Sequence, residues 1–168
     1  MPATYEPIAT TTLTGTSSSV VFSSIPQTYT DLIVVFVGKN TTDNVAMTGE
    51  FDLNSDGGNN YSSTWIGDGA TSGRGVGNNG GYYGTLCRNS VSSAVVQFMN
   101  YSNSTTYKTW LSRWGTLDGS DSINQTGQIV GMWRNTNAIT QINFNRPAGE
   151  SGSFDVGCIW TLYGIKAA

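Results

Sequence analysis

Histidine is absent from this chain of 168 residues, and charged residues make up only 11% of it. Histidine is the commonest general base and the commonest metal ligand in proteins, so its absence excludes every Ser-His and Cys-His nucleophilic arrangement. The two cysteines cannot supply the four ligands of a structural zinc site. From these absences we expect no catalytic residues, no metal site and no cofactor.

Basic clusters and long apolar runs are absent as well. The net charge is −3 and the eight lysines and arginines are scattered, which leaves no basic patch for nucleic-acid phosphates. The longest apolar run, Leu32–Val37, has six residues and is too short to span a bilayer. Residues 1–7 do not resemble a signal peptide. We therefore expect a soluble protein made in the cytosol, with neither nucleic acid nor membrane as a partner.

Cysteine is scarce, with Cys87 and Cys158 lying 71 residues apart. Small domains that depend on disulfides are usually much richer in cysteine, which favours two buried free thiols here. A single disulfide between the two residues is the alternative.

Small polar residues and glycine dominate instead, with 22 Thr, 19 Ser, 15 Asn and 21 Gly. The surface must therefore be solvated mainly by hydroxyl and amide groups. Disordered chains are short of both apolar and aromatic residues. This chain, in contrast, has 5 Trp, 8 Tyr and 6 Phe. Those aromatic side chains are numerous enough to form a core.

Alternation of apolar and polar residues predicts β-strands throughout, and no window shows the spacing of an amphipathic helix. Short strands separated by turn residues are typical of an antiparallel sandwich or barrel. We predict an all-β fold, a single antiparallel β-sandwich domain with about ten short strands. The candidates are residues 8–13, 19–22, 32–37, 47–53, 82–88, 94–99, 108–114, 128–133, 139–144 and 154–163.

Two segments depart from simple alternation. Leu32–Val37 is apolar at both odd and even positions, so both faces of this strand would be apolar. This indicates a strand covered on both faces, either central in the sandwich or at a subunit contact. Gly67–Gly81 contains seven glycines, which predicts a long surface loop.

The segment Asp52–Gly57 resembles the first half of a calcium-binding loop. Its twelfth position is Ser63 where such a loop needs a bidentate glutamate, and no helices flank it. An Asn/Asp/Gly hairpin turn is the better interpretation. Whether an ion is bound there is left open by the sequence.

Two carboxylate pairs, Glu50 with Asp52 and Asp118 with Asp121, have the residue types of a glycosidase. Neighbours on one strand or one turn seldom span a substrate cleft, so solvent-facing charges are favoured for both pairs. Gly73-Arg74-Gly75 has the spacing of a phosphate loop but is not followed by a helix, so it is a weak signal.

Trp110 and Trp114 lie on one face of a predicted strand, and Trp133 lies on another strand. Exposed aromatic residues of this kind stack on sugars in carbohydrate-binding sandwiches. Core or subunit packing is the commoner role, and alternation does not choose between the two.

Five segments carry a resemblance to a known group of proteins. They are Phe22–Leu32, Phe51–Asp56, Asn60–Ser62, Ile129–Trp133 and Thr161–Lys166. Together they resemble small virion proteins of tailed bacteriophages, particularly those that infect cyanobacteria, in order along nearly the whole chain. The resemblance implies a β-sandwich of jelly-roll type, often assembled as a homotrimer, and brings no catalytic residues.

Within that group we expect a structural protein, a capsid decoration or cement subunit on the outside of the virion. Its partners would be the major capsid protein and other copies of itself, after synthesis in the host cytoplasm. A tail or fibre tip that binds a host receptor or surface carbohydrate is the alternative. The expected contact surface combines an extended N-terminal arm of about residues 1–7 with the glycine-rich segment. Its residues are Pro2, Tyr5, Pro7, Arg74, Tyr82 and Tyr83.

Overall fold

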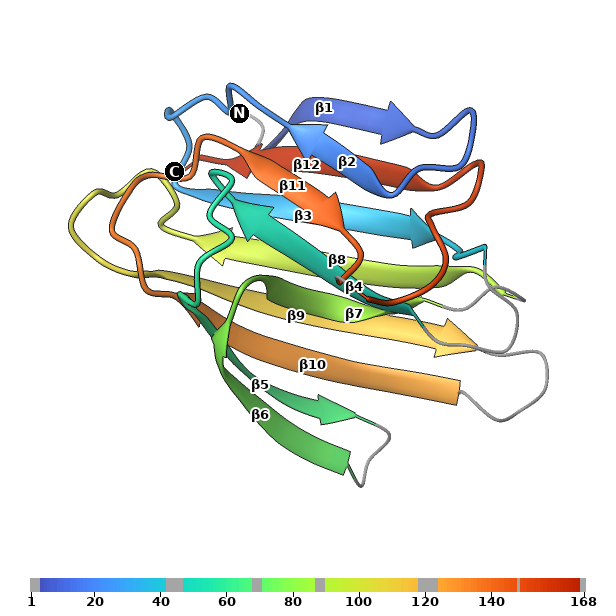
Figure 1. Cartoon of the computed structure of the whole chain (residues 1–168). Helices are drawn as coiled ribbons and strands as arrows, with labels where there is room; N and C mark the ends of the chain where they lie inside the picture. Colours follow the sequence, from blue (N-terminus) through green and yellow to red (C-terminus); the bar gives the residue numbers. More distant parts are fainter. Residues whose placement is uncertain are drawn as a thin grey trace.

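Two antiparallel β-sheets of unequal size pack face to face in the computed structural model, which describes residues 4–41, 47–67, 71–86, 90–117, 124–147 and 149–166 (Figure 1). These residues contain twelve strands and no helix, hence none that could cross a membrane. The prediction of an antiparallel β-sandwich is confirmed.

The large sheet has eight strands and the small sheet has four. The order across the large sheet is β1 (Tyr5–Thr12), β12 (Ile159–Ile165), β3 (Asp31–Gly38), β8 (Ser92–Met99), β9 (Lys108–Leu117), β10 (Asn124–Trp133), β5 (Tyr61–Gly67) and β6 (Thr71–Asn78). The order across the small sheet is β2 (Ser19–Phe22), β11 (Ile142–Asn145), β4 (Met47–Leu53) and β7 (Gly81–Leu86).

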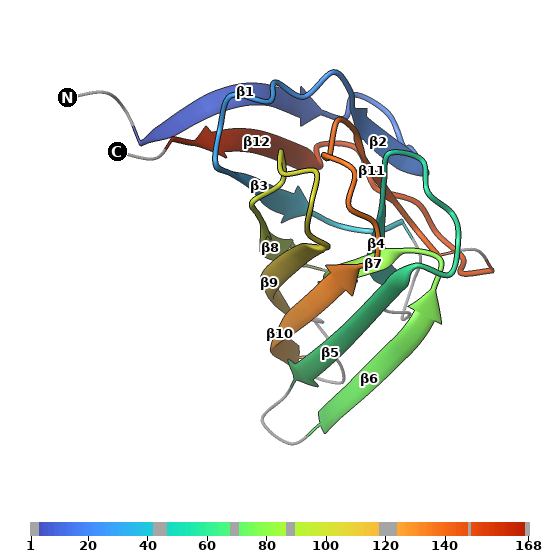
Figure 2. The same cartoon turned by 90° about the vertical axis from the view of Figure 1, so that its left-hand side faces the viewer.

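The small sheet covers only part of the large one. In Figure 1, β5 and β6 extend beyond the small sheet at the bottom of the view, and Figure 2 shows the large sheet curving strongly toward them. Strand β7 is the edge of the small sheet nearest this overhang, with β9 and β10 next to it in space. The sandwich therefore has an open side along β7.

Aromatic side chains form the centre of the core. Phe51 of the small sheet makes edge-to-face contacts with Phe98 and Trp110 of the large sheet, at ring-centroid distances of 5.0 and 5.1 Å. Such pairs contribute about 0.5–1.5 kcal/mol each beyond the burial of their area. The scarcity of aliphatic residues in the composition is offset by this cluster.

Strand β3 is fully buried on one face only. Leu32, Val34 and Phe36 are buried in the core, and the alternate side chains point away from the small sheet. The strand lies between β12 and β8, so it is central within its sheet. The predicted cover on both faces is not seen, because Ile33 and Val35 are half-buried and Val37 is 40% exposed. The alternative of a subunit contact stays a prediction.

The prediction of a surface loop over residues 67–81 is wrong, because β6 occupies most of this segment and pairs with β5. Gly73 lies opposite Trp65, where an added Cβ would be 2.1 Å from the indole ring. Glycine is required in this strand because the neighbouring ring fills the space of a side chain.

The predicted free arm is also corrected for the residues that the structure describes. Tyr5 pairs with Ile165 and Pro7 with Tyr163, so both belong to β1 at the edge of the large sheet. Proline is tolerated there because an edge strand leaves some of its N–H groups unpaired. Pro2 lies outside the described residues.

The chain crosses from the small sheet to the large one through a tight turn. Asn54 and Ser55 have φ values of 54° and 59°, and the Asp56 N–H donates to the Leu53 carbonyl at 3.0 Å. Two successive positive φ values are typical of a type I′ turn. The turn is confirmed, but it is not a hairpin, because β4 and β5 belong to different sheets.

Candidate functional site

One face of the large sheet points away from the small sheet, and we call it the outer face. Cross-strand register places six of the ten exposed large apolar side chains of the described chain on it, each between 38% and 62% exposed. They are Tyr5, Val37, Ile66, Val76, Val130 and Ile159. Three of them, Ile66, Val76 and Val130, lie on the adjacent strands β5, β6 and β10. A cluster of exposed apolar side chains marks an interaction site more often than scattered ones do.

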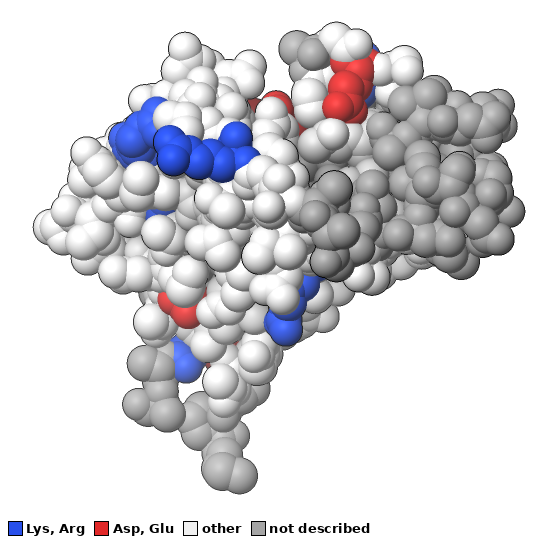
Figure 3. All heavy atoms as spheres, turned by 90° about the horizontal axis from the view of Figure 1, so that it is seen from below, with Lys and Arg blue, Asp and Glu red and all other residues white. Residues whose placement is uncertain are grey.

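Charge is sparse on the outer face. Among the side chains that the structure describes there, the charged ones are Asp31, Arg74 and Arg113. Asp31 is engaged within the sheet, because it accepts hydrogen bonds from the Gln97 side chain and the Asn100 N–H. Figure 3 views the molecule from below, from the side of β5 and β6, and there uncharged residues cover most of the described surface while lysine and arginine atoms form separate groups. Contact through this face would desolvate few charges.

A second surface feature lies along the open side of the sandwich, and we call it the aromatic groove. It has a volume of about 290 Å³. Its lining comes from both sheets and from the segment after β11. The lining residues are Thr48, Trp65, Tyr82, Gly84, Thr85, Trp114, Ile129, Pro147 and Glu150.

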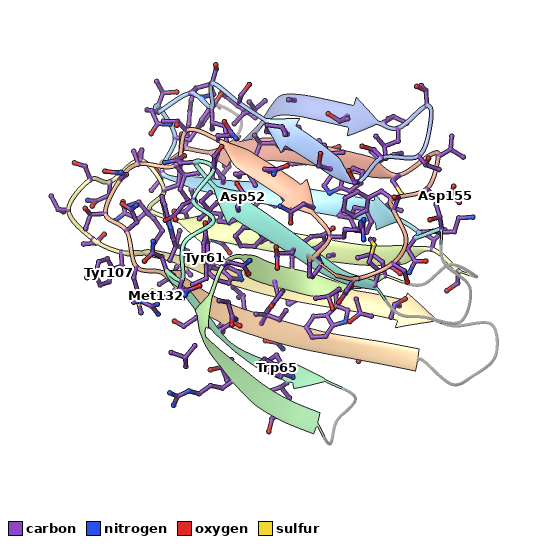
Figure 4. All side chains as sticks on the ribbon, viewed as in Figure 1. Asp52, Tyr61, Trp65, Tyr107, Met132 and Asp155 are labelled. Atoms are coloured by element: carbon purple, nitrogen blue, oxygen red, sulfur yellow. The ribbon has the colours of Figure 1, made fainter. Side chains whose placement is uncertain are left out.

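Glycines on neighbouring strands shape the groove walls. The Trp114 side chain lies between Gly84 and Gly127, where added Cβ atoms would be 2.7 Å from its Cβ and 2.3 Å from its Cη2. Trp65 lies over Gly73 in the same way, and Figure 4 shows it beside β5. The two indoles therefore hold their positions because three strand residues have no side chain.

Acidic groups adjoin the groove. The Glu150 carboxylate accepts a hydrogen bond from the Thr48 N–H at 2.8 Å. Glu50, only 7% exposed, is paired with Tyr82 across β4 and β7. Burial, with the charges of Asp52 and Glu150, raises the pKa of Glu50 to about 7. Burial and the charges of Glu50 and Glu150 also raise the pKa of Tyr82.

The shifted pKa of Glu50 predicts a pH-dependent stability. A folded-state pKa above the ordinary value of 4.5 means that the contribution of Glu50 to stability is greatest below pH 4.5 and is lost as the pH rises through about 7. We expect Glu50→Gln to be more stable than wild type at pH 8 by about 2 kcal/mol, a value that allows for solvent screening, and to match it near pH 4. Urea unfolding at the two pH values measures this. Equal differences at both would contradict it.

The Asp52–Gly57 segment is held by protein groups and not wrapped around a common centre. Asp52 Oδ2 accepts hydrogen bonds from the side chains of Asn143 and Asn145 on β11, at 2.8 and 2.9 Å. Asn54 Oδ1 accepts from backbone N–H groups of residues 140 and 141. Asp56 Oδ2 accepts from Trp133 Nε1 at 2.7 Å. These three side chains point to three different partners, which supports the interpretation as a turn.

The predicted carboxylate pair on β4 does not consist of two solvent-facing charges. Glu50 is buried, so this part of the prediction is wrong, while Asp52 is half-buried and hydrogen-bonded. Asp118 and Asp121 lie outside the described residues. Within the described ranges, no three His, Cys, Asp or Glu side chains come together as metal ligands.

The predicted contact residues do not lie close together. Tyr5, Pro7 and Arg74 all lie on the outer face, but β1 and β6 are its two opposite edges. Seven strand spacings of about 4.8 Å separate these edges, roughly 34 Å along the sheet. Tyr82 lines the aromatic groove. Tyr83 is fully buried in the core, so its prediction as a contact residue is wrong.

The structure also resolves the role of the tryptophans. Trp110 and Trp133 are fully buried in the core, whereas Trp114 lines the groove.

Cys158 is a buried free thiol whose Sγ donates to the Lys39 carbonyl at 3.2 Å. Its predicted counterpart Cys87 lies outside the described residues.

The sequence reasoning missed Trp65 and Glu150 as site residues. A usable signal was present in the glycine-rich segment, where Gly73, Gly75 and Gly77 alternate with larger residues at the period of a strand.

Comparison of the chain with protein-family models finds no match, and comparison with curated proteins finds no match either.

Proposed function

We propose that this chain is a structural virion protein of a tailed bacteriophage, a capsid decoration subunit that docks on the major capsid protein through the outer face. The observation that carries the docking surface is that six of the ten exposed large apolar side chains of the described chain lie on this face, among only three charges, with Ile66, Val76 and Val130 on adjacent strands. The resemblance in sequence supplies the phage capsid as the partner. The proposal includes the jelly-roll type, the homotrimer and a role that is not enzymatic.

Low charge suits this role physically. A subunit present in many copies on a shell lies beside identical neighbours, and a high net charge would make those neighbours repel. The net charge of −3 is small for a chain of this length. Apolar side chains on a rigid sheet also bind with little loss of conformational freedom, because the sheet holds them in place before contact.

The position of β1 changes how the contact is tested. Deleting residues 2–7 would remove the first three residues of β1, up to Pro7, and would damage the edge of the large sheet. Point substitutions of exposed outer-face residues leave the sheet intact and are the better test.

We expect Val130→Lys to lower occupancy on capsids at least tenfold, because it places a charge in the docking surface. The matched control is Val21→Lys, on the opposite side of the sandwich, since Val21 is 49% exposed and Val130 is 54% exposed. The measurement is bound protein per purified capsid of the phage that carries the gene, after both variants show wild-type thermal unfolding.

Equal occupancy for Val130→Lys and wild type would contradict docking through the outer face. Failure of the wild-type protein to bind heads, together with binding to tails, would contradict the capsid role and favour the tail or fibre tip.

A further inference from the structure

The aromatic groove holds both of the tryptophans that the core leaves incompletely buried. The chain has five tryptophans, and Trp110, Trp133 and Trp160 are fully buried. Trp65 and Trp114 are half-buried, and both line this one groove together with half-buried Tyr82. Chance placement on a surface of about eight thousand Å² does not readily gather all three rings. From this placement and the lining chemistry below, we propose that the groove binds a pyranose ring of a neutral saccharide.

The chemistry of the walls matches a sugar ring. The rings of Trp65, Tyr82 and Trp114 offer apolar surface to the C–H face of a pyranose, and the rim hydroxyls of such a ring need polar partners. Thr48, Thr85 and Glu150 provide hydroxyl and carboxylate groups at the same site. A mostly apolar groove with a few convergent polar groups is the usual form of a small-molecule site. A volume of about 290 Å³ suits a ligand of monosaccharide size.

Charge selects a neutral ligand. No lysine or arginine is among the described residues that line the groove, while Glu150 lies in the wall and Glu50 lies beside Tyr82. A phosphate or a uronate would therefore meet carboxylates and no cation. A sugar without a charged group forms hydrogen bonds at the same rim without this repulsion.

A peptide strand is a poorer occupant, although β7 is a sheet edge. A peptide added to a sheet edge binds through free backbone groups of that edge. The Tyr82 carbonyl already accepts a hydrogen bond from Trp110 Nε1 at 3.1 Å, and the Tyr83 carbonyl accepts one from Ser112 Oγ. Side chains of β9 thus occupy acceptors that an added strand would need.

The test titrates the full chain with the methyl glycosides of glucose, galactose and N-acetylglucosamine, and with the methyl glycoside of glucuronic acid. Tryptophan fluorescence and ligand-observed NMR report binding. We expect saturable millimolar binding of at least one neutral glycoside and at least tenfold weaker binding of the glucuronide.

Variants locate the site. Trp65→Ala is expected to weaken binding of that glycoside at least tenfold, while Trp65→Phe, which keeps a ring, restores it to within about threefold of wild type. Tyr107→Ala is the control, because Tyr107 is 54% exposed and lies on the segment before β9, well apart from Trp65 in Figure 4. Retention of binding by Val130→Lys would show that this site is separate from the outer face.

Three results would overturn the proposal. They are no saturable signal with any neutral glycoside at millimolar concentration, equal loss in Trp65→Ala and Tyr107→Ala, and glucuronide binding as tight as that of the neutral sugars. If Trp65→Ala fails to fold, Thr85→Lys decides the matter, because a long side chain at the groove wall must block a bound sugar.

Discussion

Gly131→Ala is expected to destabilise the protein by about 4 kcal/mol, because the added methyl group has no space. A Cβ at this position would lie 2.0 Å from Cζ2 of Trp110 and 2.3 Å from two more atoms of the same ring. The ring cannot move away cheaply, since it packs 5.1 Å from Phe51 and donates from Nε1 to the Tyr82 carbonyl. Either this hydrogen bond or the packing of the central aromatic cluster must be lost.

Gly115→Ala is the matched control, on the neighbouring strand of the same sheet. An added Cβ there meets only Cγ2 of Thr126, at 3.9 Å, which is ordinary contact. Alanine also restricts the unfolded chain more than glycine does, so this variant should match or slightly exceed wild-type stability. Urea unfolding of both variants gives the comparison. Similar midpoints for the two would show that Trp110 adapts and that our account of this contact is wrong.

Asp56→Ala is expected to destabilise the protein by about 3 kcal/mol, since it removes the acceptor that joins the crossing turn to the large sheet. Its Oδ2 accepts from Trp133 Nε1 at 2.7 Å, and its Oδ1 accepts from the Gly58 N–H at 2.9 Å. Without the carboxylate, the N–H of a fully buried indole has no acceptor. Chemical unfolding at pH 7 measures the loss.

The effect should also depend on pH. Burial alone would raise the pKa of Asp56, but hydrogen bonds from Asn60, Trp133 and Gly58 lower it below its ordinary value of 3.8. The stabilisation is therefore complete above pH 4 and is lost as the pH falls through the folded-state pKa. Asp155→Ala serves as control, because the Asp155 carboxylate forms a partly exposed ion pair with Lys39 at 3.8 Å and accepts an exposed hydrogen bond from the Val156 N–H at 2.8 Å. Losing these exposed contacts should cost under about 1 kcal/mol. An equal loss in the two variants would contradict a special role for Asp56.

Alternation predicted most strands because their core-facing residues are large. In β3 and β8, buried Val, Phe and Leu alternate with the outward side chains, and that pattern is visible without any tertiary knowledge. It failed at the start of the last strand. Val156 lies two residues before buried Cys158, so alternation predicts that it is buried, but it is 54% exposed. The chain turns at Val156 and Gly157, and β12 begins only at Ile159. Buried and exposed side chains alternate along the chain only where the backbone stays extended.

The pair β5 and β6 could not be predicted by the same rule, because the inward residues of β6 are glycines. What fills the space over Gly73 is the ring of Trp65 from the adjacent strand. A glycine can therefore face the inside of the sandwich when a large side chain from the adjacent strand fills the space above it. The same arrangement occurs between β10 and β9, where the ring of Trp110 fills the space over Gly131.

The aromatic groove lies beyond sequence reasoning for a different reason. Its walls come from five strands of two sheets and from the segment after β11, so no local pattern links Trp65 to Glu150. The groove also depends on a mismatch in width between the sheets, which is a property of the whole topology. Composition indicated that binding was more plausible than catalysis, but the location of a site required the fold.

The pairing of β1 with β12 has a consequence for the order in which the molecule is built. Tyr5 and its partner Ile165 lie 160 residues apart in the sequence. Strand β1 has β12 as its neighbour in the large sheet, so its ladder cannot form before β12 is available. Such a distant pairing is slow to form. We therefore expect this ladder to close late in folding, and until then β1 is exposed to mispairing with other chains.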